Sequence, residues 1–274
     1  MTTTTLNAEI PREHRAAPQS LRLVRAELLK VRKRRGLVAA TLALTIAPMI
    51  VAYAILVIVH AADPAKHGPA GGAKNFADSL NFLGALTIVA GILVGATVGT
   101  GDLGAGVFRE LVATGRSRVS LFAARIPAGL AFLIVPVVIG FTVSATAATL
   151  LAGRLDPPGA RLIIHSMGWL VLLGTVSFVI ALGFSSLISS RGTSIGVLLG
   201  WLLVAMPLLM QITALGVLRE GLIGAATERM EPAAVLGSGG AHVPMSVTTA
   251  VAVVTAWAIV PLAAGAWRTQ KRDA

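Results

Sequence analysis

The sequence predicts an all-α membrane protein with six transmembrane helices, and three observations lead to this prediction. First, the 274 residues are 55% hydrophobic and only 13% charged, whereas a soluble domain carries roughly 25% charged residues. Second, the mean hydropathy is +0.81. Third, six apolar segments each reach the roughly 20 residues that a helix needs to cross about 30 Å of hydrocarbon. One membrane domain is therefore favoured over two soluble domains.

The six apolar segments contain no Asp, Glu, Lys or Arg, and they define a membrane domain over residues 37–267. Proline lies inside four of them, which membrane helices tolerate because neighbouring groups satisfy the freed backbone atoms. The predicted spans are Leu37–His60, Phe82–Gly101, Ile126–Gly153, Leu162–Ser190, Thr193–Val217 and Val243–Trp267, with an outer loop over about residues 218–242.

The residues before the first span divide into a tail and a basic helix. Residues 1–20 are polar and contain two prolines, so we expect a flexible cytoplasmic tail. Residues 21–35 show helical amphipathic spacing, which predicts an interfacial helix lying along an anionic bilayer surface. Its apolar stripe consists of Leu21, Val24, Leu28 and Val31, and its cations are Arg22, Arg25, Lys30, Arg32 and Lys33.

The distribution of charge predicts the orientation. With the N-terminus inside, all but six of the 23 Lys and Arg residues fall on the cytoplasmic side, while the 12 acids divide evenly. The net charge of +11 is therefore a topology signal, and no nucleic-acid partner is predicted. We expect a multi-pass protein of the cell (plasma) membrane with both tails, including residues 268–274, in the cytoplasm.

Small residues mark the second predicted span. Gly84, Gly91, Gly95 and Gly99 lie close to one helical face, and small residues at such spacing let helix backbones approach closely in lipid. The sequence predicts a packing seam and leaves open whether it lies inside the bundle or at a subunit contact.

Two nucleotide-binding patterns are excluded. Residues 99–104 fit the dinucleotide-binding pattern GxGxxG, which requires a preceding strand and an acidic residue about 20 positions farther on. Here a membrane span precedes the pattern and no acid follows at that distance, so dinucleotide binding is not predicted. The chain contains no Gly-Lys dipeptide, and so no phosphate loop of the GxxxxGK[ST] type. We predict no enzyme active site, and the absence of Cys removes thiolate metal sites and cysteine nucleophiles; no metal or substrate-binding residue is predicted.

The segment at about residues 102–118 predicts a short amphipathic helix between the second and third spans. Gly115 suits its C-terminus, and Ser117 is suited to cap the helix that follows. The alternative is a membrane-surface connector without a partner. The apolar stripe is Leu103, Val107, Phe108, Leu111 and Val112, and the polar residues include Asp102, Arg109, Glu110, Arg116 and Arg118.

In three respects the chain resembles the permease subunits of the ABC-2 transporter family. These are the basic entry helix Glu27–Arg35, the acid Asp102 followed by Gly-Val-Phe-Arg-Glu-Leu and Gly-Arg-Ser-Arg, and the six-span layout with a longer outer loop. Two positions depart from the family pattern: Asp102 stands where Glu is common, and Gly115 where many members have Pro.

The resemblance implies a permease subunit of an ABC exporter that forms half of a translocation pathway. Its partners would be a second permease, identical or different, two copies of a cytoplasmic ABC ATPase, and the lipid bilayer. This chain would bind no cofactor, since ATP and Mg would sit in the ATPase. The segment 102–118 would be the coupling helix, with Asp102 at its start and with Val107, Phe108, Arg109, Glu110, Leu111, Gly115, Arg116, Ser117 and Arg118 at the ATPase.

Other classes of function fit the sequence less well. An ion-coupled carrier places ionisable groups within the membrane, and the predicted spans have no Asp, Glu, Lys or Arg. An intramembrane hydrolase would need His165 close to Ser185 or Ser186, which lie about 30 Å farther along one helix. A membrane sensor or scaffold that does not transport remains an alternative.

Overall fold

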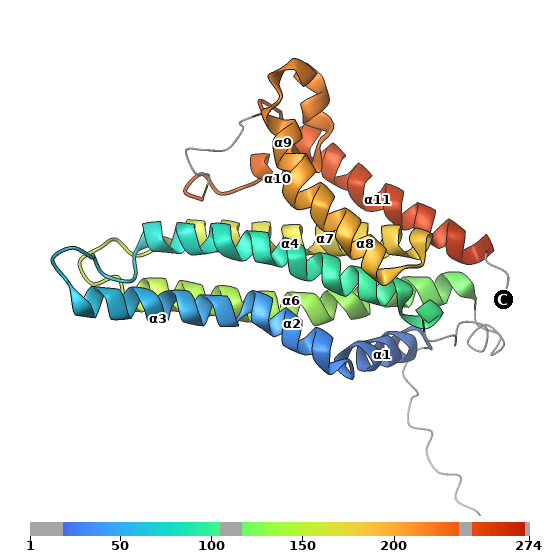
Figure 1. Cartoon of the computed structure of the whole chain (residues 1–274), viewed down its shortest axis with the longest axis horizontal. Helices are drawn as coiled ribbons and strands as arrows, with labels where there is room; N and C mark the ends of the chain where they lie inside the picture. The colour runs from blue at the N-terminus through green and yellow to red at the C-terminus, as the bar shows by residue number, and fades with distance from the viewer. Residues whose placement is uncertain (1–18, 105–116, 236–242, 272–274) are drawn as a thin grey trace, which may run out of the picture.

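The computed structural model describes residues 19–104, 117–235 and 243–271, and within them every regular element is helical (Figure 1). Six helices or helix runs are long and apolar enough to cross a membrane, which confirms the predicted all-α, six-span architecture. They are Arg35–Ala62, Ala73–Gly101, Arg118–Leu150, Ala160–Ile188, Arg191–Gln211 and Val247–Lys271.

The helical elements follow one another with short connections. The first span joins two helices, and the fifth joins an α-helix, a π-helical stretch and a further α-helix. In order they are α1 (Gln19–Arg32), α2 (Arg35–Thr45), α3 (Ala47–Ala62), α4 (Ala73–Gly104), α6 (Arg118–Leu150), α7 (Ala160–Ile188), α8 (Arg191–Leu199), η1 (Gly200–Ala205, π), α9 (Met206–Gln211), η2 (Thr213–Gly221, 3-10), α10 (Ile223–Arg229) and α11 (Val247–Lys271).

Several predicted span limits were wrong: two helices extend beyond their apolar cores, and one ends before its apolar run does. The second span begins at Ala73 and not at Phe82, so that Lys74 and Asp78 lie on its first turns. The third begins at Arg118 and includes Arg125, so the helix itself carries charge. The fifth ends at Gln211 and not at Val217, since Ile212 is extended and the chain continues as the 3-10 stretch η2.

The helices form a central pair with others packed around it. In the most apolar 18-residue stretch of α4, and likewise in that of α7, two thirds of the residues are buried, whereas in α11 only 11% are. In Figure 1, α3, α4, α6 and α7 run along the long axis, while α8 and α11 cross it at an angle. We name the end with α1 and the starts of α6 and α8 the basic end, and the end with the connections 63–72 and 151–159 the loop end.

The glycines of α4 pack against α7. A Cβ at Gly91 would lie 2.8 Å from Cβ of Ser177, and one at Gly95 would lie 2.4 Å from the carbonyl oxygen of Phe178. A Cβ at Gly84 would likewise lie too close to the ring of Trp169, and one at Gly99 would lie too close to Oγ of Ser185. The seam that the sequence predicted therefore lies inside this chain, between its two central helices.

Three hydroxyls join helices in the apolar interior. Ser79 of α4 and Ser144 of α6 have their Oγ atoms 2.6 Å apart, and the hydroxyl of Tyr53 in α3 lies 3.4 Å and 3.3 Å from them. All three residues are buried. Because buried hydroxyls are costly without partners, this cluster fixes the register of the first three spans.

Candidate functional site

The segment that the sequence singled out joins α4 to α6 at the basic end. Residues 105–116 lie outside the described residues, and with them Val107, Phe108, Arg109, Glu110, Leu111, Gly115 and Arg116. Asp102 belongs to the last turn of α4, while Ser117 and Arg118 begin α6. The described structure therefore shows how the two ends of this segment are held.

Two arginines lie against the end of α4 that leads into the segment. Arg125 of α6 is only 2% exposed, and its Nη1 lies 3.5 Å from the carbonyl oxygen of Gly99. The guanidinium of Arg34 lies over Gly101, where a Cβ would be 3.1 Å from its Nη2. Cations are favourable near a helix C-terminus because the carbonyl dipoles point toward them. Residues before α2 and within α6 thus fix the end of α4.

The other end of the segment is fixed by a cap and a cross-helix bond. Ser117 Oγ accepts a hydrogen bond of 3.1 Å from the backbone N–H of Ser120, which confirms the predicted cap. Arg118 Nη1 donates to the carbonyl oxygen of Gln270 in α11 at 2.9 Å. The segment therefore begins at a helix end that contacts Arg34 and Arg125 and ends at a helix start that contacts α11.

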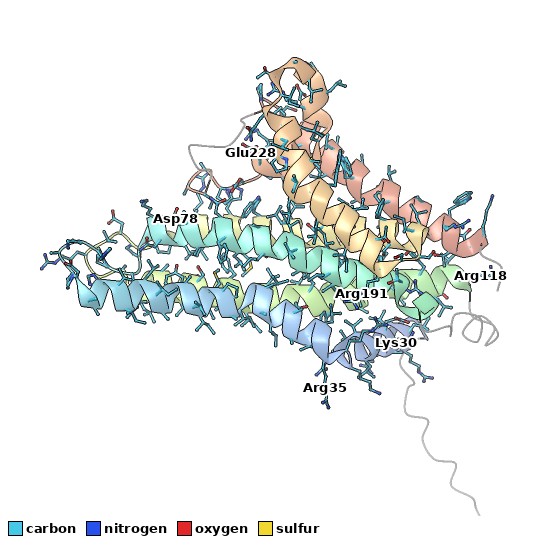
Figure 2. The ribbon with its side chains drawn as sticks, in the orientation of Figure 1. Lys30, Arg35, Asp78, Arg118, Arg191 and Glu228 are labelled. Atoms are coloured by element: carbon cyan, nitrogen blue, oxygen red, sulfur yellow. The ribbon has the colours of Figure 1, made fainter. Side chains whose placement is uncertain are left out.

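The basic helix α1 packs against α6. Arg22, Arg25, Arg32 and Lys33 are exposed, as is Leu21 of the predicted apolar stripe, whereas Val31 is buried. Lys30 forms an ion pair of 2.6 Å with Glu27, which is 7% exposed. Figure 2 shows Lys30, Arg35, Arg118 and Arg191 in the half of the molecule at the basic end, away from Asp78.

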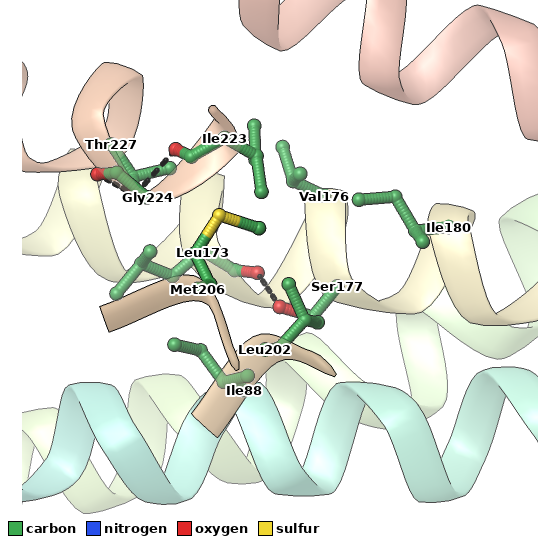
Figure 3. A pocket seen from close by; sticks show the side chains of 10 residues that line it. All are labelled: Ile88, Leu173, Val176, Ser177, Ile180, Leu202, Met206, Ile223, Gly224 and Thr227. Atoms are coloured by element: carbon green, nitrogen blue, oxygen red, sulfur yellow. Dashed lines mark hydrogen bonds between the residues drawn. The ribbon is translucent and has the colours of Figure 1, made fainter. Parts of the chain in front are cut away.

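A small cavity lies among α4, α7, the fifth span and α10 (Figure 3). Its volume of about 50 Å³ leaves room for little more than water. Ser177 donates to the carbonyl of Leu173 at 2.7 Å, and Thr227 lies 3.0 Å from the carbonyls of Ile223 and Gly224. Because both hydroxyls bond within their own helices, the cavity offers no converging polar groups for a substrate.

The chain between α9 and α11 is bonded to several spans. Trp169 of α7 donates to the carbonyl of Thr227 at 3.2 Å, and Asn81 of α4 donates to that of Val235 at 2.8 Å. Trp257 of α11 donates to the carbonyl of Gly221 at 3.0 Å. The predicted outer loop thus begins within the 3-10 stretch η2, contains the short helix α10, and contacts both central helices.

One carboxyl of this loop has a shifted pKa. Burial, together with the nearby Glu228 carboxylate, raises the pKa of Glu231 from 4.5 to about 7. The folded loop therefore binds a proton that the unfolded chain releases, and the loop loses stability as pH rises from about 4.5 to about 7.

We expect Glu231→Gln to remove this pH dependence. Amide exchange of residues 223–235, corrected for intrinsic rates, should be slower at about pH 5.5 than at about pH 8 in the unaltered chain, and equal at both in the variant. Glu220→Gln in the preceding 3-10 stretch is the control and should leave the difference intact. Equal exchange at both pH values in the unaltered chain would refute the shift.

Sequence reasoning missed Arg34 and Arg125 as anchors of the segment. Arg34 lies within the basic entry helix Glu27–Arg35, where the sequence does not distinguish it from its neighbours. Arg125 directly precedes the predicted third span, Ile126–Gly153, and it shares a helical face with Leu121, Phe122 and Ala128, all of which are buried. That spacing was the available signal, because a charge in phase with the buried face of a helix must have an internal partner.

The fold and the charge distribution define a multi-pass helical membrane protein whose second connection is fixed at both ends by the bundle. A sequence model described as ABC-2 family transporter protein matches residues 23–199, from α1 through α8. The match covers more than half of the chain, which therefore belongs to the ABC-2 transporter family and is an ABC permease. A comparison with curated proteins finds no match to this chain.

Proposed function

We propose that this chain is the membrane subunit of an ABC exporter and works with a separate cytoplasmic ATPase. The observation that carries the proposal is the family match over residues 23–199 together with the anchoring of the segment at 102–118. In this proposal the protein resides in the plasma membrane and its basic end faces the cytoplasm, in keeping with its excess of Lys and Arg. Both termini lie on the cytoplasmic side.

The mechanism follows from the two anchors. Two ATPase subunits close on ATP and push the segment at 102–118 of each of two paired permeases. Arg125 and Arg34 pass the displacement to α4, and Arg118 passes it to α11. Because α7 packs tightly on α4 and, at Gly183, on α11, these three helices move as one body against the fifth span, and a pathway between the two permeases changes its side of access.

The test is purification of the chain in mild detergent from its native host, followed by identification of the proteins that accompany it. We expect a stoichiometric partner that carries a GxxxxGK[ST] phosphate loop. Recovery of the chain alone, under conditions in which a known ABC complex stays intact, would contradict the proposal and favour a sensor or scaffold.

A further inference from the structure

A groove opens between the basic helix and the third span, outside the segment at 102–118. Its volume is about 500 Å³. The groove exists because α1 leaves the axis of the first span at residues 33–34 and lies against α6, where the side chains of Ala131 and Pro136 are too short to fill the space. Its lining consists of Leu28 and Arg32 of α1, Val38 of α2, and Ala131, Phe132, Val135 and Pro136 of α6.

One charged side chain, Arg32, stands among these apolar walls. Lys30 on the same helix is neutralised by Glu27 at 2.6 Å. Within residues 19–104, 117–235 and 243–271, by contrast, no carboxylate forms an ion pair with Arg32. A guanidinium in that position presents a planar fork of donors that matches phosphate oxygens.

Helix lengths place the groove near the level at which the first span begins. Gly140 of α6 packs on the backbone of Thr45, and α2 and α6 both run from the basic end toward the loop end (Figure 1). Arg35, about 15 Å from Thr45 toward the basic end, is therefore level with about residue 130 of α6. Ala131, Val135 and Pro136 follow on the hydrocarbon side of that level, and Val135 is 57% exposed.

We propose that this groove binds one anionic phospholipid from the leaflet at the basic end. The phosphate accepts hydrogen bonds from Arg32, and one acyl chain lies along Phe132, Val135 and Pro136. An anionic headgroup also complements the cations that lie close to Arg32 along the chain, which include Lys33 and Arg35, both exposed. The bound lipid then joins α1 to α6. This proposal requires only that the chain is membrane-embedded, so it can fail while the proposed transport function holds.

The test is native mass spectrometry of the full chain in mild detergent, titrated with phosphatidylglycerol or with phosphatidylcholine. We expect one tightly held phosphatidylglycerol and weaker binding of phosphatidylcholine. Arg32→Gln should lower the affinity for phosphatidylglycerol about tenfold, whereas Arg32→Lys, which keeps the charge but loses the planar fork, should lower it by less. Ala131→Leu places a larger side chain in the path of the acyl chain and should weaken both lipids.

The matched control is Arg22→Gln, which removes the same charge from an exposed position of α1 that does not line the groove. An equal loss in Arg22→Gln and Arg32→Gln would show diffuse attraction and overturn the site, as would full affinity in Ala131→Leu. Because the chain has no Cys, Val135→Cys reports occupancy by a second copy. A disulfide-linked dimer in phosphatidylglycerol vesicles would make the groove a subunit interface and overturn the lipid proposal.

Discussion

Gly95→Leu is expected to destabilise the isolated chain by about 3 kcal/mol, because it forces apart the two central helices. Even a Cβ at this position would lie 2.4 Å from the carbonyl oxygen of Phe178 and 2.8 Å from Cβ of Ala181. The contacted atoms include α7 backbone, which cannot rotate away as a side-chain end can. A lower melting temperature in detergent and a smaller monodisperse fraction on size exclusion should follow.

Gly168→Leu is the matched control for this substitution. Gly168 lies on α7, is exposed, and has nothing within 4 Å of a Cβ. It therefore makes the same chemical change on the lipid-facing side of the same helix pair, and we expect a small effect. If Gly95→Leu melts like the control and loses only oligomers, the seam lies between subunits and the α4–α7 contact is wrong.

Replacing Arg109 and Glu110 together with Ala is expected to leave the permease folded while uncoupling it from its ATPase. By resemblance these two charges face the motor, and truncating one partner of a buried, hydrogen-bonded charge pair across an interface costs about 2–5 kcal/mol. We expect retention of the ATPase partner and permease-dependent ATP hydrolysis to fall about tenfold or more. Both are measured on the complex reconstituted in liposomes.

The control is the double substitution Arg154→Ala and Asp156→Ala, which removes one cation and one anion from the exposed connection at the loop end. Its melting temperature, partner retention and hydrolysis rate should match those of the unaltered chain. Hydrolysis and partner retention at the unaltered level in the Arg109 and Glu110 variant would rule out the coupling role of this segment.

The sequence by itself determined the membrane class, the number of spans and the two-sided distribution of charge. These are local quantities: the length of an apolar run decides whether a helix can cross hydrocarbon, and cations in short connections decide which side each one occupies. The cap at Ser117 was predictable for the same reason, since its partner Ser120 is three residues away.

Only the tertiary structure decided which surfaces meet. The spacing of Gly95 and its neighbours predicted a close contact, but the partner helix α7 lies about 80 residues farther along the chain, and helical periodicity carries no information on partners. Arg125 fell outside the predicted third span because hydropathy treats a charge as the end of a span, whereas a buried guanidinium can bond to the carbonyl of Gly99 on another helix. The groove at Arg32 likewise depends on the angle at which α1 leaves the first span, an angle set by its packing on α6.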